Sequence, residues 1–278
     1  MNRPASESVS DGGNVRVAAL QMVSTPRVEE NLKTAAGLVA QAVAQGAQLV
    51  ALPEYFPIMG LSDADKFAVR EVDGRGAIQD FLAATARKHG IWLVGGSLPL
   101  VAAEAGKVLN SCLVFDPQGE RVARYDKIHL FGFQKGAERY NESATIEAGS
   151  QPVVFDAPFG RVGVSICYDI RFPELYRAQG AVDLQIIPAA FTETTGRAHW
   201  EILLRARAIE NQCYVLAVAQ GGKHENGRET HGNSMLIDPW GIILDRLPKG
   251  PGVVVGDVDH ARIADVRASL PALKHRVM

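Results

Sequence analysis

A cysteine near the middle of the chain stands where an apolar run gives way to charged residues. The run is GVSIC, residues 163–167, and YDIRFPELYR follows directly. If the run is a β-strand, Cys167 lies at its end, where a side chain can leave the sheet and enter a pocket. Cys112 and Cys213 lie within strand-like stretches, where free cysteine packs as a small buried hydrophobe. The local pattern alone leaves Cys167 open between core packing and catalysis.

Two charged residues end other predicted strands. Glu54 closes the segment QLVALPE, and Lys127 closes RVARYDK just before an apolar stretch. A carboxylate at such an edge is partly desolvated, which raises its pKa and suits it to act as a general base. Each residue alone also fits a surface role, Glu54 in a turn and Lys127 with its stem covering apolar surface. An acid, an amine and a thiol are nevertheless the groups needed to hydrolyse an amide through a thioester.

Other common catalytic motifs are absent from the sequence. It contains no GxxxxGK[ST] phosphate loop, no GxGxxG after a strand, no HExxH and no CxxC. GVSIC comes close to the GxSxG elbow of serine hydrolases, but Cys167 stands where the elbow needs glycine, so a hydrolase using Ser165 is a distant alternative. His224 and His231 lie in a polar loop and are expected to be solvated. We therefore expect no metal and no cofactor.

Composition and charge narrow the class of protein. The chain has 278 residues, of which 47% are hydrophobic and 22% charged, as in globular proteins. A net charge of −2 without a dense basic stretch argues against nucleic acid and favours a small substrate. No apolar run approaches the roughly 20 residues of a membrane span, and the polar N-terminus is no signal peptide. Three cysteines without short-range pairing indicate a reducing compartment, so we expect a cytoplasmic protein.

The elements that must position these residues begin with an alternating pattern. Residues 15–22 predict a strand, and apolar residues at helical spacing predict a helix over 28–44. A short strand over 48–54 follows, then a helix that ends at Gly90 and a strand over 91–97. A β-α-β-α-β opening favours a layered α/β protein.

The second half of the chain contains two predicted hairpins. The first spans 107–127 around the turn DPQG, and the second spans 234–247 around DPWG. Residues 130–149 show weak periodicity and are expected to form a long functional loop. The remaining predicted elements are a strand over 161–166, a short helix after Pro173, a strand over 184–190, a helix around 199–212 and strands over 213–220 and 253–259. We expect residues 1–14 to be a flexible leader and residues 15–278 to form a single domain.

Several segments together resemble the carbon–nitrogen hydrolase (nitrilase) superfamily, which uses a Glu, Lys and Cys triad. These segments are LPEYF, YDKIHLF and GVSICYDIRFPELYR. PAAFTETTGRAHWEILLRARAIENQCYV and HGNSMLIDPWG are similar to later segments of its Nit-type amidases. The resemblance covers residues 15 to about 276. It implies an α/β fold, a four-layer α-β-β-α sandwich, that stacks with a second copy into a homodimer or a higher homo-oligomer.

Matched motif by motif, the resemblance also implies catalytic roles. Glu54 corresponds to the general base and Cys167 to the nucleophile. Lys127 corresponds to a protonated amine that holds the oxyanion together with the backbone N–H of Tyr168. Glu142, in RYNES, matches a second family glutamate that positions Lys127.

Three further residues match positions that contact substrate in Nit-type enzymes, namely Arg171, Phe191 and Thr195. The forked donors of Arg171 suit a carboxylate on the substrate. An ion pair between Asp169 and Arg171 is the structural alternative.

The resemblance implies a thiol amidohydrolase that cleaves the C–N bond of a small ω-amide and releases ammonia or an amine and an acid. Tyr-Asp after the cysteine is similar to amidases, whereas nitrilases more often carry Trp-Glu. LLRARAIENQCYV and the PWG hairpin most resemble deaminated-glutathione amidases and ω-amidases. Two features depart from that pattern: Arg197 stands where animal Nit-type proteins often have proline, and the loop over 129–143 has its own length. A nitrilase, an N-carbamoyl amino acid hydrolase and a silent binding module are the alternatives.

Overall fold

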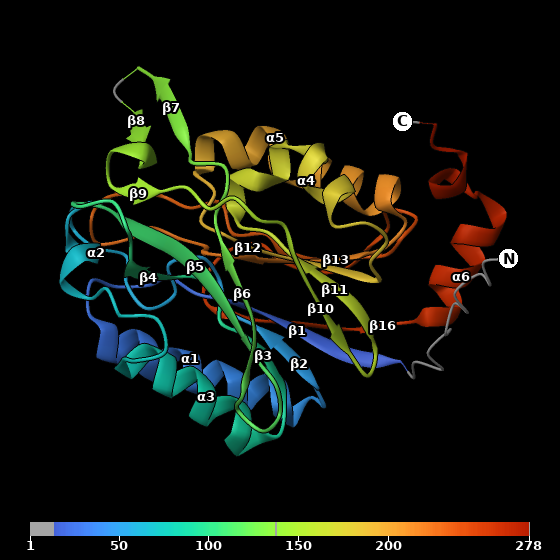
Figure 1. Cartoon of the computed structure of the whole chain (residues 1–278), viewed down its shortest axis with the longest axis horizontal. Coiled ribbons are helices and arrows are strands. Elements are labelled where there is room, and N and C mark those ends of the chain that lie inside the picture. The colour runs from blue at the N-terminus through green and yellow to red at the C-terminus, as the bar shows by residue number, and fades with distance from the viewer. Residues whose placement is uncertain (1–13, 137, 278) are drawn as a thin grey trace, which may run out of the picture.

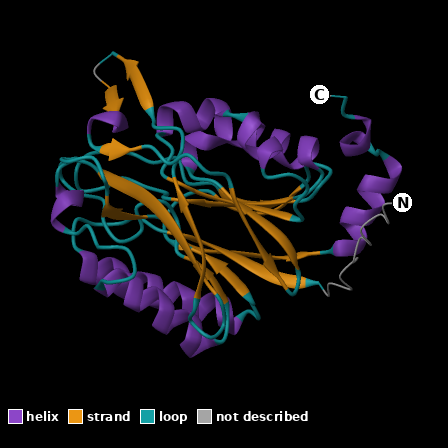
Figure 2. Ribbon diagram, in the orientation of Figure 1, coloured by secondary structure: helices purple, strands orange, loops and turns teal. Residues whose placement is uncertain are grey.

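The computed structural model describes residues 14–136 and 138–277. Two β-sheets lie face to face, and helices cover the outer face of each, so the layers follow the order α-β-β-α (Figures 1 and 2). The predicted four-layer sandwich is therefore confirmed. Within these ranges no helix has the length and apolar character needed to cross a membrane. The predicted leader, residues 1–14, lies outside the described residues except for Asn14.

The first sheet has eight strands, most of them from the first half of the chain. Its main path runs β16-β1-β2-β3-β5-β4, and both β6 and β9 also pair with β5. The strands are β1 (Val15–Gln21), β2 (Leu49–Ala51), β3 (Trp92–Val94), β4 (Leu98–Val101), β5 (Val108–Phe115), β6 (Arg121–Asp126), β9 (Ile146–Glu147) and β16 (Gly252–Val258). Helices α1 (Val28–Ala44) and α3 (Ala77–His89) cover its outer face, and the short helix α2 (Asp65–Ala68) precedes α3.

The second sheet has six strands in the order β10-β11-β12-β13-β14-β15. They are β10 (Val153–Ala157), β11 (Gly160–Val164), β12 (Leu184–Ala189), β13 (Tyr214–Ala219), β14 (Ser234–Ile237) and β15 (Ile243–Leu247). Helices α4 (Pro173–Ala178) and α5 (Glu193–Asn211) cover its outer face, and α6 (His260–Ser269) follows β16. The described residues also include the short 3₁₀ helices η1 (Glu142–Ala144), η2 (Cys167–Arg171) and η3 (Ala272–His275).

Side-chain alternation along β1 explains the layering. Val17 and Ala19 belong to the core between the sheets, whereas Ala18 and Leu20 belong to the core under α1 and α3. Because both faces are covered there, residues 17–20 read as one continuous apolar run. Strands β1, β2 and β3 run parallel, as do β11, β12 and β13. The carboxyl ends of parallel strands are where ligands bind in open α/β sheets.

Most of the predicted elements are confirmed. Helix α1 has both predicted ends, and α3 ends at Gly90, whose φ of 63° is the left-handed conformation typical of a helix C-terminus. Cys112 and Cys213 are buried core residues, as predicted. Helix α5 begins earlier than expected, because Thr192 caps a polar first turn that carries no apolar periodicity. The structure also contains β4, β10 and α6, which were not predicted from the sequence.

The expected long loop over 130–149 is instead partly regular. Strands β7 (Gly132–Lys135) and β8 (Glu138–Asn141) form an antiparallel hairpin, which stands out from the sandwich in Figure 1. None of the described residues in the two strands is fully buried, so the sequence carries no apolar alternation that marks them as strands.

Candidate active site

Three of the predicted site residues form a buried chain of ion pairs. The Nζ atom of Lys127 lies 2.8 Å from Oε1 of Glu54, and 3.0 and 2.8 Å from the two carboxylate oxygens of Glu142. The Lys127 side chain is fully buried and that of Glu54 is 1% exposed, so the surface roles left open for both are wrong. Burial alone would lower the pKa of the Lys127 ammonium, but the Glu142 and Glu54 carboxylates outweigh it. The pKa of Lys127 is therefore raised well above its ordinary value, and the amine stays charged.

Donors on both sides hold Glu142 against Lys127. Its Oε1 accepts a hydrogen bond from the Tyr55 hydroxyl at 2.8 Å, and its Oε2 accepts one from the backbone N–H of Phe131 at 2.7 Å. Burial raises the pKa of the Glu142 carboxyl, but Lys127 and these donors outweigh burial and leave the pKa below its ordinary value. Glu142 therefore stays ionised. Tyr55 was not predicted from the sequence, because its only signal there is its position directly after Glu54.

Both sheets contribute to the orientation of Glu54. Its Oε1 accepts a hydrogen bond from Nδ2 of Asn110 in β5 at 3.0 Å, and its Oε2 accepts one from the backbone N–H of Ala190 at 2.8 Å. The turn before Glu54 packs against Gly96, which has a φ of 57° and whose added Cβ would lie 2.1 Å from the Pro53 carbonyl oxygen. Only glycine fits there without moving the turn. Asn110 and Ala190 lie among apolar strand residues, so nothing in the sequence marked them.

The backbone at Cys167 is strained. Cys167 begins η2, and its φ of 51° lies in the left-handed region, which costs a residue with a Cβ about 1–2 kcal/mol. The buried Asp169 carboxylate braces this turn. It accepts hydrogen bonds from the backbone N–H of Ile166 at 2.8 Å, the Tyr125 hydroxyl at 2.6 Å and the backbone N–H of His129 at 3.0 Å. These bonds link η2 to the end of β6 and hold the thiol in place.

The electrostatic surroundings of Cys167 keep its thiol protonated at rest. Burial raises the thiol pKa most, the Glu54 carboxylate raises it further, and the Lys127 ammonium acts in the opposite direction. The resulting pKa lies well above the ordinary value, so a base must accept the proton as the sulfur attacks. Ser165, by contrast, is fully buried and hydrogen-bonds the Tyr176 hydroxyl at 2.8 Å. This geometry gives no support to the serine-hydrolase alternative.

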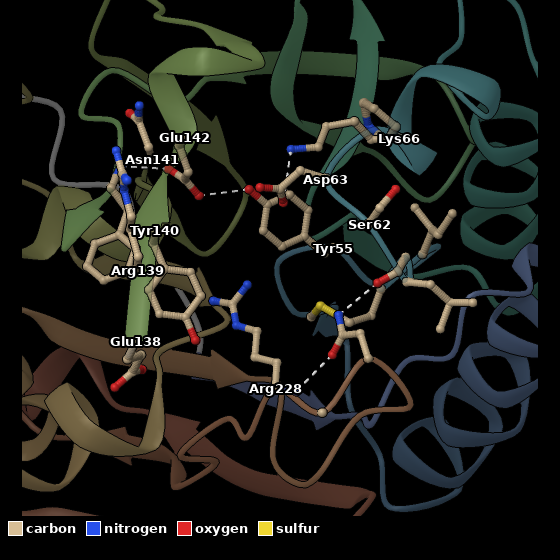
Figure 3. A pocket seen from close by; sticks show the side chains of 18 residues that line it. Tyr55, Ser62, Asp63, Lys66, Glu138, Arg139, Tyr140, Asn141, Glu142 and Arg228 are labelled. Atoms are coloured by element: carbon tan, nitrogen blue, oxygen red, sulfur yellow. Dashed lines mark hydrogen bonds and ion pairs between the residues drawn. The ribbon is translucent and has the colours of Figure 1, made fainter. Parts of the chain in front are cut away.

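Two adjoining cavities lie at the site. The smaller, called the inner chamber, has a volume of about 10 Å³. It is lined by Phe131, Glu142, Cys167, Tyr168, Ala190, Phe191, Thr192, Thr195 and Arg228. The larger, called the outer cavity, has a volume of about 450 Å³ and is shown in Figure 3. Phe131, Glu142 and Arg228 border both cavities, and the predicted substrate residues Tyr168, Phe191 and Thr195 line the inner chamber.

Arg171 lines neither cavity. Its Nη1 lies 3.2 Å from Nδ1 of His199, and its guanidinium packs 5.7 Å from the ring centre of Tyr168 and 5.3 Å from that of Phe191. The alternative ion pair with Asp169 is also absent from the described residues, because that carboxylate is taken by the groups that brace η2. A carboxylate-binding role for Arg171 stays a prediction.

The histidine-containing loop over 221–233 is more buried than its polar sequence indicates. His224 is 3% exposed; its Nδ1 lies 3.0 Å from the Ser24 carbonyl oxygen and its Nε2 lies 2.9 Å from the Thr230 hydroxyl. Burial lowers the pKa of His224. His231 is half-buried, so the expectation that both are solvated is wrong. The loop folds onto the sandwich, where His224, Asn226 and Arg228 hydrogen-bond the backbone carbonyls of Ser24, Gly60 and Ala190. Across 14–136 and 138–277, no group of three or more His, Cys, Asp or Glu side chains could hold a metal ion.

Comparisons with known proteins agree with this geometry. Residues 16–268 match the model of the carbon–nitrogen hydrolase family. The chain is 46% identical over 267 residues to the deaminated glutathione amidase of Synechocystis sp., covering 94% of this chain and 97% of that protein. It is 38% identical over 264 residues to the omega-amidase NIT2 of Danio rerio, covering 94% of each. The crystal structure of Saccharomyces cerevisiae Nit3, a member of the nitrilase superfamily, superposes with a TM-score of 0.85 at 29% identity, covering 99% of this chain and 100% of that one.

Fold, site and comparisons together define the class: the chain belongs to the carbon–nitrogen hydrolase family. It is a hydrolase of C–N bonds other than peptide bonds. The predicted family and enzyme class are thus confirmed.

Proposed function

We propose that this protein is a thiol amidase that hydrolyses deaminated glutathione or a similar small ω-amide through a thioester on Cys167. The observation that carries the proposal is the buried ammonium of Lys127, held between two carboxylates beside a protonated thiol. Core packing does not need such a cluster, since buried charges are costly unless they are paired. The names of the relatives, deaminated glutathione amidase and omega-amidase, support this substrate class.

The first half of the reaction forms the thioester. The Cys167 sulfur bonds to the amide carbonyl carbon while its proton passes to Glu54. The carbonyl oxygen gains negative charge, which Lys127 and the backbone N–H of Tyr168 stabilise. The proton on Glu54 then passes to the amide nitrogen, the C–N bond breaks, and ammonia or an amine leaves.

The second half releases the acid. Water attacks the thioester carbon and gives a proton to Glu54, the C–S bond breaks, and the proton returns to the sulfur. Lys127 keeps a charged partner throughout, because Glu142 stays ionised while Glu54 carries the proton. The pKa of the Tyr55 hydroxyl is raised by burial and by the Glu142 and Glu54 carboxylates, so it remains a hydrogen-bond donor to Glu142.

The alternative reactions use the same fold and the same thiol. A nitrilase or an N-carbamoyl amino acid hydrolase would differ in its substrate. The test is therefore to assay deaminated glutathione, a primary ω-amide, a nitrile and an N-carbamoyl amino acid side by side. We expect the amides to react fastest, with no turnover by Cys167→Ala or Lys127→Ala and with an acyl adduct on Cys167 in the intact mass. Normal turnover by Cys167→Ala would refute the mechanism, and preference for the nitrile or the carbamoyl compound would refute the substrate class.

We also propose that two copies associate through an exposed apolar face on the second sheet's helix layer. Ile202 and Ile209 on α5 are 71% and 47% exposed, and Trp240 in the β14–β15 turn is 50% exposed. Helix and turn form one surface, because Nε of Arg205 donates to the Gly241 carbonyl at 2.8 Å. Large exposed apolar patches mark interaction sites. A homodimer stacked over this face fits the family resemblance.

A cytoplasmic location is part of the same proposal. All three cysteines are buried free thiols, which suits a reducing compartment. Subcellular fractionation tests it, and recovery of the protein outside the cytoplasm would contradict it.

A further inference from the structure

The outer cavity contains an arginine that pairs with no carboxylate. Nη2 of Arg228 donates to the Ala190 carbonyl at 2.6 Å, and its guanidinium lies 5.1 Å over the Tyr140 ring. Its buried Nε has no hydrogen-bond partner, and within the described ranges Arg228 makes no ion pair. Figure 3 shows the guanidinium pointing into the cavity beside Tyr140. Its position at the border of the inner chamber brings it close to a reacting substrate.

A second cation, Lys66, faces the same cavity, and little negative charge lies near its ammonium group. Its side chain is 13% exposed, and its Nζ donates to the Thr145 hydroxyl at 2.9 Å. The nearest carboxylate is Asp63 at 3.8 Å, whose side chain is 82% exposed. Burial lowers the pKa of the Lys66 ammonium; Asp63 and Glu142 partly oppose this, and the charges of Lys127 and Arg228 lower it further. An anion bound nearby would relieve the repulsion.

The acidic side chains of the cavity wall have other partners. Glu142 is bound to Lys127 and Tyr55, and Glu138 accepts a hydrogen bond from the Thr194 hydroxyl at 2.8 Å. Asp63 lies largely in solvent. Among the described residues that line the cavity, the carboxylates therefore either have partners or lie in solvent, whereas Arg228 and Lys66 are available for a ligand.

The size and position of the outer cavity indicate which part of a substrate enters it. About 450 Å³ is within the range of pockets that hold whole small molecules, roughly 300–1,000 Å³, and far exceeds what departing ammonia needs. The leaving nitrogen must receive its proton from Glu54. The inner chamber beside Cys167 has a volume of about 10 Å³, which is about the space of one small molecule such as water or ammonia. An amine half as large as an amino acid or a dipeptide must therefore extend into the outer cavity, which Phe131, Glu142 and Arg228 connect to the inner chamber.

We propose that the outer cavity binds the amine half of an N-substituted amide, and that Arg228, assisted by Lys66, binds a carboxylate on that half. The inference rests on the proposed function, because it specifies the leaving group of the same reaction. The substrate class is then an acylated amino acid or dipeptide with a free carboxylate, and the enzyme releases an amino acid or a peptide rather than ammonia. Deaminated glutathione, whose amine half is the dipeptide cysteinylglycine, has this form.

Three substrates with one common acyl half test the proposal. They are deaminated glutathione, its analogue with the terminal carboxylate replaced by a carboxamide, and 2-oxoglutaramate, whose leaving group is ammonia. The variants are Arg228→Gln, Arg228→Lys and Lys66→Met. The control is Arg161→Gln, an exposed position in β11 that lines neither cavity.

We expect wild-type kcat/KM to be about 10- to 100-fold higher for deaminated glutathione than for the carboxamide analogue, the value of one charged hydrogen-bonded contact. Arg228→Gln should abolish this preference, lowering kcat/KM for deaminated glutathione at least about tenfold more than for the other two substrates, while Arg228→Lys retains part of the preference. Lys66→Met should reduce the same preference, which keeps the test valid if Arg228→Gln does not fold. The proposal is overturned if Arg228→Gln lowers kcat/KM equally for all three substrates. It is also overturned if wild type has equal kcat/KM for deaminated glutathione and its carboxamide analogue.

Binding to the Cys167→Ala variant separates this inference from the proposed function. Calorimetric titration compares cysteinylglycine with its terminal amide and needs no turnover. If wild type hydrolyses none of the three substrates, the proposed function fails, and the binding comparison alone decides the inference. At least tenfold tighter binding of the carboxylate form upholds the inference, and equal binding overturns it.

Discussion

Replacing Glu142 by glutamine tests whether Lys127 needs two carboxylates. The Glu142 oxygens accept two hydrogen bonds from Lys127, one from the Tyr55 hydroxyl and one from the backbone N–H of Phe131. Glu142→Gln removes the negative charge and turns one of these acceptors into an NH₂ donor. At least one donor then faces another donor in a buried site, which is unfavourable in both the resting enzyme and the transition state.

Replacing Glu142 by glutamine costs more free energy in the transition state than in the resting enzyme. At rest Lys127 keeps Glu54 at 2.8 Å, so the cost is that of charged hydrogen bonds, about 1.5–3 kcal/mol. For a chain of this size the melting temperature should fall by roughly 4–10 °C. When Glu54 carries the thiol proton, Lys127 has no carboxylate left, and removing the partner of a buried charge costs about 3–5 kcal/mol. The difference of about 2 kcal/mol lowers kcat about 30-fold.

The assay follows acid formation from deaminated glutathione and thermal unfolding by circular dichroism. Glu174→Gln, at an exposed position in α4, is the control and should change neither quantity. If Glu142→Gln lowers the melting temperature but leaves kcat within twofold of wild type, Lys127 does not need its second carboxylate during the reaction. Such a result would contradict the role of Glu142 as the charged partner of Lys127 in the transition state.

Four further predictions follow from single contacts. Glu54→Gln removes a charge that raises the thiol pKa, so alkylation of Cys167 by iodoacetamide at about pH 8 should become faster while amide hydrolysis falls at least about 100-fold; slower alkylation would contradict the assigned electrostatics. Cys167→Gly should melt roughly 2–4 °C above Cys167→Ala, because glycine removes about 1 kcal/mol of left-handed backbone strain; an equal or lower value argues against strain. Ile202→Glu should convert a dimer to a monomer in light scattering after gel filtration, and an unchanged mass would exclude this face as the interface. Burial alone would raise the pKa of Glu193, but three basic partners hold it at about 2, so its contribution to stability is present above pH 4.5 and is lost as the pH falls towards 2. Glu193→Gln should therefore lower the melting temperature at neutral pH and not at about pH 2, and equal effects at both would contradict this linkage.

The layered fold and the positions of Glu54, Lys127 and Cys167 follow from local patterns in the sequence. Glu54 and Cys167 follow apolar strands, and Lys127 stands between the polar strand β6 and an apolar stretch. These are local signals, because alternating burial is reflected in neighbouring residues. The motifs around the three residues, on which the family resemblance rests, are also short local segments of the sequence. A polar residue directly after a buried strand is therefore visible before any tertiary contact is known.

Which groups meet at the site depends on contacts between distant parts of the chain, and these contacts are seen in the folded protein alone. The bond between Glu54 and the Ala190 N–H joins residues 136 positions apart, and the ion pair between Lys127 and Glu54 joins residues 73 apart. No periodicity within a strand or helix reports such a contact, since it depends on how the sheets stack. Arg228 reads as an ordinary loop residue in the sequence. It becomes a candidate substrate ligand only because its loop folds back over the edge where the parallel strands of both sheets end.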